Sequence, residues 1–290
     1  MLAFLRLMRP ANIVTALADI LAGAAIAGAW SVGEFPSDLG WLLLATVGLY
    51  GGGVVFNDVF DAELDREERP ERPIPSGQIS LRTAALGGFW LLVAGCCFAG
   101  QVSLLSGGIA VVVALLAVGY DKYGKHHVVF GPLIMGLCRG GNLLLGMSIV
   151  GAAVGQYWYL ALIPVVFIAD ITLTSRGEVH GGNSRELRVA LGLDIVVCLA
   201  FCLLGFMTSF NLGWVIPPLV VWAQTNIGSK RRALREGTPQ AVMQAVKMGV
   251  LSLIVLNATF VAGFLGIWEA LLVVLLVPLS RFLARYFAVT

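Results

Sequence analysis

The sequence predicts an all-α membrane protein in which a bundle of nine or ten helices crosses the bilayer. Of its 290 residues, 58% are hydrophobic and 12% are charged, whereas soluble domains carry about 25% charged residues. The chain contains a series of apolar runs, and its basic residues fall almost entirely in alternate loops. A chain of this composition cannot cover a soluble surface with polar side chains, so it belongs in a bilayer.

Ten apolar segments are candidate membrane spans, because a helix of roughly 17–25 residues can cross the hydrocarbon core. In chain order they are 12–30, 39–58, 82–101, 103–120, 128–149, 157–174, 189–209, 212–227, 243–265 and 268–286. The last is the weakest, because Pro278, Arg281 and Arg285 shorten its apolar part. The count of nine or ten stays open for this reason.

The basic residues predict the orientation of the bundle. Outside the fifth span, they precede the first span, follow an even-numbered span or begin the span after it, or lie near the C-terminus. The opposite loops contain Glu34, Asp38 and Glu269 but no Lys or Arg. The positive-inside rule therefore predicts a cytoplasmic N-terminus. The net charge of +2 reflects this bias and gives no reason to expect nucleic acid as a partner. No linker divides the chain, so residues 1–290 are expected to form a single transmembrane domain.

The segment NDVFDAELD (57–65) gathers carboxylates at a predicted membrane boundary. On a helix, Asp58, Asp61 and Asp65 fall within an arc of about 60°, with Asn57 on its flank. Three carboxylates on one face repel each other, so a cation should lie against them. Mg²⁺ prefers such oxygen ligands and takes further oxygens from phosphates. The segment is therefore a candidate site for Mg²⁺ and a diphosphate.

A solvated acidic helix end, paired with the arginines that follow it, is the alternative interpretation of this segment. The connector RPIPSG (72–77) argues for a site, because its two prolines and its glycine turn hold Arg72 near the carboxylates. The planar guanidinium of arginine matches the geometry of phosphate. We therefore expect Arg72 to bind the diphosphate.

Further cations come from the segment YDKYGKHH (120–127). Lys122 and Lys125 could neutralise a diphosphate. They could equally be ordinary juxtamembrane lysines, and the sequence leaves both interpretations open.

A second polar segment, ADITLTSRGEVHGGN (169–183), follows the sixth span. Asp170, Thr174 and Glu178 recur every four residues, so they should share one helix face, opposite the first acidic motif. Glu178 could bind a metal ion or accept a proton. His180 could coordinate the metal weakly, pair with pyrophosphate or act as the base. Alternatively, Glu178 only balances the charge of neighbouring arginines.

Arg139 and Asn142 lie one helical turn apart inside the fifth span. Together they could reach oxygens of a phosphate or of an acceptor substrate. The alternative is that Arg139 forms a structural pair with a buried acid such as Asp19 or Asp194.

The segments LRLMRP, NDVFDAELD and RPIPSG together resemble the UbiA superfamily of intramembrane prenyltransferases. The first aspartate-rich motif of that superfamily, N-D-x-x-D-x-x-x-D, is matched at Asn57, Asp58, Asp61 and Asp65. A closer resemblance is to the EboC branch, through LYGGGVVFNDVFDAELD, GKHH, MGLCRGGNLLLG and SRGEVHGGN.

The resemblance implies a helical bundle, usually of nine spans, around a central cavity that opens to the cytoplasmic side. It implies Mg²⁺ as cofactor, an isoprenoid diphosphate as donor, and an acceptor that is aromatic or a hydroxylated, cyclitol-like molecule. The isoprenoid tail would lie along a lateral groove that faces the membrane lipid, and we expect the protein in a bacterial inner (plasma) membrane.

The residues and the resemblance together give the candidate site. The expected metal ligands are Asp58, Asp61, Asp65 and Glu178. The expected catalytic residues are Asp58, Asp61, Glu178 and His180. The expected substrate-binding residues are Asn57, Arg72, Lys122, Lys125, Arg139 and Asn142.

The second motif departs from the family pattern, which supplies two or more aspartates after the sixth span. Here Glu178 stands in that register, with His180 and Gly182 where acids are often found. Whether a second Mg²⁺ binds is therefore open. The departure also leaves an alternative function, namely a non-catalytic protein that binds or carries isoprenoid or lipid diphosphates.

Overall fold

The computed structural model describes residues 2–31, 33–125, 127–178, 184–207 and 209–287. All named elements in these residues are helices, which confirms the all-α prediction; the β structure described is an isolated bridge between Ser31 and Glu34. The elements are α1 (Leu2–Met8), α2 (Pro10–Ile26), α3 (Ser37–Phe60), α4 (Ala62–Glu68), α5 (Leu81–Val102), α6 (Leu104–Gly119), the π-helix η1 (Tyr120–Gly124), α7 (Phe130–Met147), α8 (Gly151–Tyr157), the 3₁₀-helix η2 (Trp158–Ala161), α9 (Leu162–Ser175), α10 (Ser184–Leu204), α11 (Leu212–Glu236), α12 (Pro239–Phe264), α13 (Ile267–Val274) and α14 (Leu276–Leu283).

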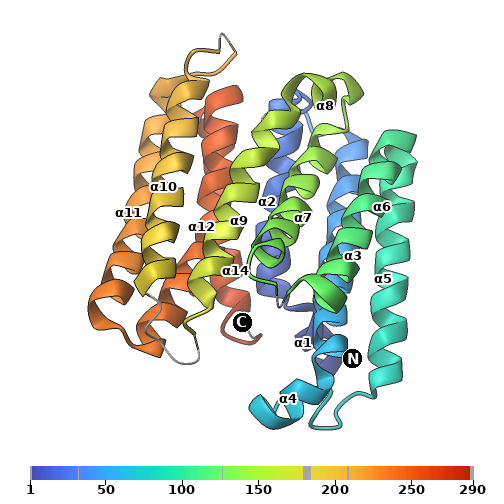
Figure 1. Cartoon of the computed structure of the whole chain (residues 1–290). Helices are drawn as coiled ribbons and strands as arrows, with labels where there is room; N and C mark the ends of the chain where they lie inside the picture. The colour runs from blue at the N-terminus through green and yellow to red at the C-terminus, as the bar shows by residue number, and fades with distance from the viewer. Residues whose placement is uncertain (1, 32, 126, 179–183, 208, 288–290) are drawn as a thin grey trace.

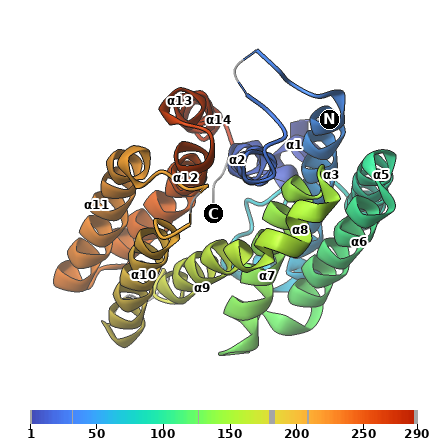
Figure 2. The same ribbon diagram turned by 90° about the horizontal axis from the view of Figure 1, so that it is seen from above.

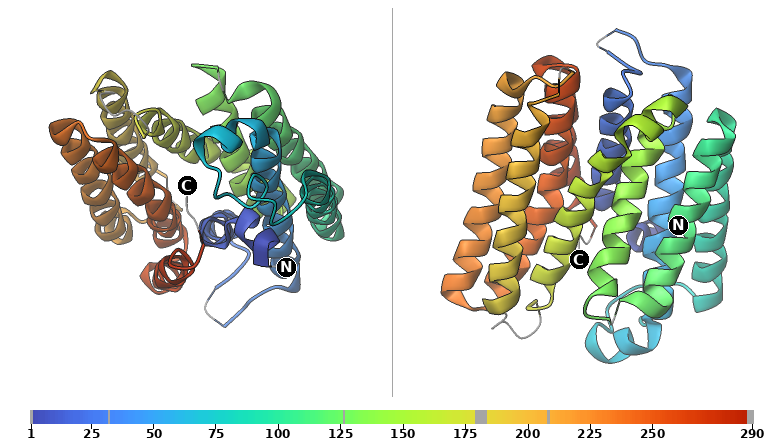
Figure 3. Two further views of the ribbon diagram at one scale, coloured as in Figure 1. Left: turned by 90° about the horizontal axis from the view of Figure 1, so that it is seen from below. Right: turned by 45° about the horizontal axis from the view of Figure 1, so that its top comes forward.

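The long helices form a bundle in which chain neighbours pack side by side. Figure 2 shows α10, α11 and α12 on one side and α2, α3, α5, α6 and α7 on the other. Contacts of α9 with α7 and of α12 with α2 join the two groups. Figure 1 shows α1, α4 and both chain ends at one end of the bundle, with α8 at the opposite end. Seen from below in Figure 3, α4 lies across the end of the bundle near α3.

Six of the described helices are long and apolar enough to cross a membrane. A seventh is added if α1 and α2, which meet at an angle of 48°, count as one bent span. The remaining predicted spans coincide with α7, α11 and the pair α13–α14. Polar residues interrupt the apolar runs of these two helices, namely Arg139 and Asn142 in α7, and Gln224 and Asn226 in α11. The number of crossings, nine or ten, therefore stays a prediction.

The expected tenth span is two short helices that join at Leu275. Pro278 contributes to this break, because it has no N–H to donate to the carbonyl of Val274. The second of these helices packs on α2, where the Ser280 hydroxyl donates to the carbonyl of Ala11 at 2.8 Å. The C-terminal segment thus closes the bundle against its first long helix.

Glycines allow α2 and α7 to approach closely. A Cβ added at Gly23 would lie 2.3 Å from the Leu143 carbonyl oxygen, and one added at Gly146 would lie 2.5 Å from the Ile20 carbonyl oxygen. No larger side chain fits at either position without moving backbone. The close approach lets Asp19 of α2 form an ion pair with α7 inside the bundle.

A second buried ionic cluster joins α9, α10 and α11. The ammonium group of Lys230 contacts both Asp170 and Asp194, and the Lys230–Asp194 distance is 2.8 Å. All three side chains are at most 1% exposed. The cluster fixes the register of α9, whose opposite face reaches the candidate site.

Candidate active site

A cavity of about 450 Å³ extends from the α4 end into the bundle. Its wall comes from α2, α3, α4, α6, η1, α7, α9 and α12. Charged side chains such as Asp61 and Arg72 line its outer part, and Thr46 and Asn142 line its deep part. Thr46 and Asn57 are separated along α3 by about 16 Å, at 1.5 Å per residue. The intervening wall is largely apolar, with Val54, Val113 and similar residues.

The first acidic motif is not one continuous helix. The helix α3 ends at Phe60, and α4 begins at Ala62, so Asp61 occupies the junction. Asp61 and Asp65 line the cavity together with Asn57, whereas Asp58 is 4% exposed and lies outside the lining. The structure thus brings Asn57, Asp61 and Asp65 to one end of the cavity but leaves Asp58 behind them, and the motif is divided between two helices.

Each aspartate of the motif is held by a basic side chain. Asp58 contacts Arg9 at 2.7 Å and Arg72 at 3.3 Å, and the same Nη1 atom of Arg72 lies 2.7 Å from Asp65. Asp61 forms an ion pair with Lys125. The pairing with Arg72 is what the alternative interpretation of the motif expected, but these groups also border the cavity.

The donor set of the motif fits Mg²⁺ in its chemistry. No three His, Cys, Asp or Glu side chains converge as a metal site within the part of the chain that the structure describes. The carboxylates of Asp61 and Asp65 and the amide oxygen of Asn57 are nevertheless the hard ligands that Mg²⁺ prefers. The Oε1 atom of Glu178 is buried and accepts no hydrogen bond from the described residues. These four side chains could hold a divalent cation at the charged end of the cavity.

The two predicted lysines have different surroundings. Lys125 contacts Asp61, as a diphosphate-binding cation beside the motif should. Lys122 is exposed, and its ammonium group lies 4.9 Å from the centre of the Tyr123 ring. The structure therefore does not bring Lys122 to the cavity.

The second motif reaches the cavity by a turn and not by a helix face. The helix α9 ends at Ser175, and Glu178 lies in the following turn and lines the cavity. Asp170 is fully buried against Lys230, so the predicted common face of Asp170 and Glu178 is wrong. Thr172 and Ser175, which the sequence analysis did not assign, line the cavity instead. His180 lies outside the described residues.

Burial raises the pKa of the Glu178 carboxyl above its ordinary value of 4.5. The positive charges of Arg69, Lys247 and Arg9 oppose this effect in part. A proton held more tightly than usual is the property of a carboxylate that acts as a proton acceptor.

Arg139 forms the structural pair with Asp19 that one interpretation expected, and its binding of substrate oxygens stays a prediction. Its Nε atom lies 2.7 Å from Asp19, and its Nη2 atom donates to the Thr15 hydroxyl at 3.0 Å. It also lines the cavity, as does Asn142, which donates to Asp19 at 2.9 Å and accepts from the Thr46 hydroxyl at 2.7 Å. Both side chains belong to a buried polar network that borders the deep part of the cavity.

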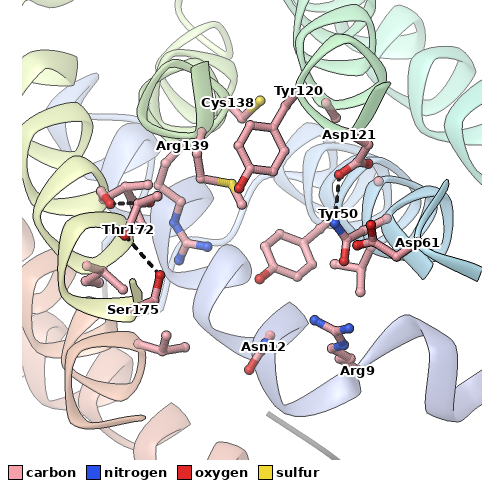
Figure 4. A pocket seen from close by; sticks show the side chains of 18 of the residues that line it. Arg9, Asn12, Tyr50, Asp61, Tyr120, Asp121, Cys138, Arg139, Thr172 and Ser175 are labelled. Atoms are coloured by element: carbon pink, nitrogen blue, oxygen red, sulfur yellow. Dashed lines mark hydrogen bonds between the residues drawn. The ribbon is translucent and has the colours of Figure 1, made fainter. Parts of the chain in front are cut away.

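Several lining residues escaped the sequence analysis. Arg9 was part of the LRLMRP segment of the resemblance and of the orientation signal, but it was given no role at the site. Tyr50 lies within an apolar run, and its ring centre is 5.9 Å from the guanidinium of Arg139. Figure 4 shows the Tyr50 ring between Asp61 and Asp121 on one side and Thr172 and Ser175 on the other.

Comparison with known proteins supports a common origin for most of this chain. Residues 16–225 match the model of the UbiA prenyltransferase family. A digeranylgeranylglyceryl phosphate synthase from Methanothrix thermoacetophila is 34% identical over 214 residues, which cover 72% of this chain and 79% of the relative. The corresponding synthase from Methanothermobacter thermautotrophicus is 27% identical over 217 residues, covering 72% and 74% of the two chains.

Solved structures share the fold. A UbiA homologue from Archaeoglobus fulgidus bound to GPP and Mg²⁺ has a TM-score of 0.68 at 16% identity, covering 87% of this chain and 99% of the other. A UbiA homologue from Aeropyrum pernix has a TM-score of 0.70 at 15% identity, covering 85% and 96%. At these identities the likeness concerns the fold alone.

The relatives limit how finely the chain can be placed. Neither synthase is described as an EboC protein, so membership of that branch stays a prediction. Both relatives are archaeal, so the bacterial membrane also stays a prediction. The family match covers well over half of the chain, and the Methanothrix relative exceeds 30% identity over most of both sequences. This integral membrane protein belongs to the UbiA prenyltransferase family.

Proposed function

We propose that this protein transfers a prenyl group from an isoprenoid diphosphate to a small hydroxylated acceptor within the membrane. The observation that carries the proposal is the polarity of the cavity. Its outer end holds Asp61, Asp65 and Arg72, and its interior is lined largely by apolar residues. An isoprenoid diphosphate has the same distribution, with a charged head and an apolar chain.

The charged end supplies the groups that a departing pyrophosphate needs. Arg9, Arg72 and Lys125 are the cations that border the motif, and they would contact the diphosphate oxygens. When bound, Mg²⁺ would neutralise negative charge that develops on the leaving group. Asp58, Asp61 and Asp65 are the proposed ligands, with Asp58 reaching the ion only after its contacts with Arg9 and Arg72 rearrange, and Glu178 is left free to accept a proton.

The transfer itself exchanges one bond for another. The bond between C1 of the prenyl group and the diphosphate oxygen breaks, and pyrophosphate leaves with the electron pair. An acceptor oxygen bonds to C1, and its proton passes to Glu178. The rings of Tyr50 and Tyr120 line the cavity and can stabilise positive charge on the allylic group.

The acceptor oxygen would lie beside C1 and Glu178 near the charged end, and the rest of the acceptor would extend toward the polar wall deeper in the cavity. Arg139 and Asn142 offer hydrogen-bond donors there, and the charge of Arg139 is balanced by Asp19. This wall suits hydroxyl oxygens. The relatives are named as synthases of a glyceryl phosphate ester, which supports an oxygen acceptor of polyol type. An aromatic acceptor is the alternative that the assay below separates.

The test is release of pyrophosphate from geranyl diphosphate by the purified protein, with Mg²⁺ and either a glyceryl phosphate lipid or an aromatic hydroxy acid. We expect release that requires Mg²⁺ and acceptor together, and a product mass equal to acceptor plus prenyl group. Asp61→Ala should lower the rate by about 100-fold, the scale of losing one transition-state contact. Glu63→Gln, at an exposed position on α4, should leave it unchanged.

Two outcomes would contradict the proposal. One is full activity in Asp61→Ala. The other is tight binding of geranyl diphosphate without pyrophosphate release under any of these conditions, which would favour the non-catalytic binding or carrier function. The same assay in inverted membrane vesicles tests the expected cytoplasmic access to the site.

A further inference from the structure

The short π-helix η1 places an unassigned carboxylate against the first motif. The Nδ2 atom of Asn57 donates to Oδ1 of Asp121 at 3.0 Å. Asp121 is 4% exposed, and both residues line the cavity. These residues lie on different elements, α3 and η1, so their contact depends on how the two elements pack.

The contact determines which end of the Asn57 amide is free. A carboxylate only accepts hydrogen bonds, whereas an amide has a donor end and an acceptor end. In the structure Asn57 turns its NH₂ group toward Asp121. Its Oδ1 atom, the other end of the same amide, takes part in none of the hydrogen bonds between described residues. The free group on the cavity wall is thus an oxygen.

An oxygen at this position has a specific chemical use. Diphosphate oxygens only accept hydrogen bonds, so an amide oxygen cannot bind them directly. A divalent cation such as Mg²⁺ instead takes neutral and charged oxygen ligands. Asp61 and Asp65 line the same end of the cavity and offer such ligands.

The geometry of η1 explains how Asp121 reaches Asn57. Its π-helical turn closes with a hydrogen bond from the Lys125 N–H to the Tyr120 carbonyl at 2.9 Å. Single π-turns within helices often occur at functional sites. This turn presents Asp121 to Asn57 and Lys125 to Asp61, so one element orients two members of the motif.

We propose that Asp121 is a positioning residue that fixes the Asn57 amide with its oxygen available to Mg²⁺. The Asn57 oxygen, already placed among the possible ligands, is then held toward the metal ion, and this role replaces the diphosphate binding that the sequence suggested. The inference rests on the proposed function, because it needs a metal ion at the motif. The inference means that the carboxylate of Asp121 on η1, outside the first acidic motif, supports that motif.

The test exchanges the two side chains. In Asp121→Asn, the partner of Asn57 can either donate or accept, so the Asn57 amide is no longer fixed. In Asn57→Asp, two carboxylates face each other. In the double variant Asn57→Asp/Asp121→Asn, the new amide donates to the new carboxylate, and one oxygen at position 57 stays available to the metal.

Binding of Mn²⁺, followed by electron paramagnetic resonance and by displacement with Mg²⁺, gives a readout that does not depend on activity. Asp121→Asn should weaken binding by about 10–100-fold, the usual cost of losing a residue that orients a metal ligand. The exchanged pair should recover most of that loss. Glu63→Gln, exposed on α4, serves as the matched control, and the thermal unfolding midpoint of each variant reports on folding.

The possible results separate the two proposals. If the parent binds Mn²⁺ and Asp121→Asn binds it equally well, the positioning role is wrong while the proposed function stands. The positioning role is also wrong if the exchanged pair unfolds like the parent but binds Mn²⁺ no better than Asp121→Asn. The contact between positions 57 and 121 would then be restored without restoring metal binding, so it would be purely structural. If the parent binds no Mn²⁺, with or without methylene diphosphonate, the metal-dependent function fails and the inference fails with it.

Discussion

Arg9 enters the site through a backbone conformation that few non-glycine residues adopt. Its φ and ψ angles are 48° and 67°, in the left-handed region, and it is the sole described non-glycine residue with positive φ. Such a conformation costs on the order of 1–3 kcal/mol and persists where the surroundings hold it. Here it ends α1, lets α2 begin at Pro10, and directs the guanidinium to Asp58 at 2.7 Å. The strain therefore lies at a residue with a role at the charged end of the cavity.

Glu178 gives a prediction at the same scale. Because burial raises its pKa in the folded state, the folded protein holds this proton more tightly than the unfolded chain. The stability that the bound proton contributes is present below the ordinary pKa of 4.5 and is lost as the pH rises through the raised value. Glu178→Gln cannot lose a proton, so its unfolding midpoint should increasingly exceed that of the parent as the pH rises.

Thermal unfolding in detergent between about pH 4 and about pH 8 measures this effect. The difference between Glu178→Gln and the parent should be smallest at the acid end. Glu63→Gln, an exposed acid, should show no such trend. A difference that is constant with pH, or that shrinks as the pH rises, contradicts the assigned environment of Glu178.

The residues that sequence reasoning located share a local signal. Asn57, Asp61 and Asp65 lie within one short segment, so their spacing alone brings them together. Arg9 and Asp121 contact that segment from distant parts of the chain, and neither spacing nor composition indicates such a contact. The Asn57–Asp121 pair required the packing of η1 on α3 to be known.

At the scale of elements, the buried cluster of Lys230, Asp170 and Asp194 holds α9, α10 and α11 together. Lys230→Met would leave two carboxylates in the bundle interior without their cation. Breaking a buried ion pair from one side costs about 3–5 kcal/mol, because the remaining charge is uncompensated. We therefore expect Lys230→Met to lower the free energy of unfolding by about that amount.

Titration with SDS measures this loss. Arg231→Met, which removes an exposed positive charge at the adjacent position of α11, is the matched control and should cost far less. Adding Asp170→Asn and Asp194→Asn to Lys230→Met should restore most of the stability, because no buried charge is then left. Equal stability of Lys230→Met and Arg231→Met would show that the cluster contributes nothing.

This cluster also explains why the four-residue spacing of the second motif gave a wrong prediction of which residues face the cavity. A spacing of four residues correctly identifies one face of α9 as polar, but it does not say which neighbour that face meets. Asp170 meets Lys230, which lies on α11 and was assigned only to a cytoplasmic loop by the sequence. The cavity receives the opposite face, with Ile171 and Thr172, and Glu178 arrives only after α9 has ended.

At the scale of the whole molecule, the composition and the apolar runs were sufficient to predict a helical membrane bundle. The helices occur at the predicted ranges because each apolar run must satisfy its backbone hydrogen bonds internally within a bilayer. Hydropathy alone identifies the helices with buried charges less clearly. Arg139 and Lys230 are compatible with the bilayer only because acidic residues on other helices balance their charges. Those partners are a property of the assembled bundle, and they determine where its polar walls lie.

The distribution of charge over the two ends of the bundle gives the last prediction. Figure 1 shows α1 and α4 at one end and α8 at the other. The segments at the α4 end carry Arg66 and Arg69, and those at the opposite end carry Glu34 and Asp38 without a basic residue. Basic loops are retained on the cytoplasmic side during insertion. We therefore expect the charged mouth of the cavity to face the cytoplasm.

Single cysteines introduced into a variant that lacks the five native ones can test this orientation. Phe35→Cys lies in the acidic end, where Phe35 is 59% exposed, and Glu67→Cys lies on the exposed side of α4. A maleimide that cannot cross membranes should label Phe35→Cys in intact cells, and Glu67→Cys only after the membrane is permeabilised. The reverse pattern would place the motif outside the cell. Isoprenoid diphosphates would then have to reach the cavity from the outer face, and the proposed access to the site would be wrong.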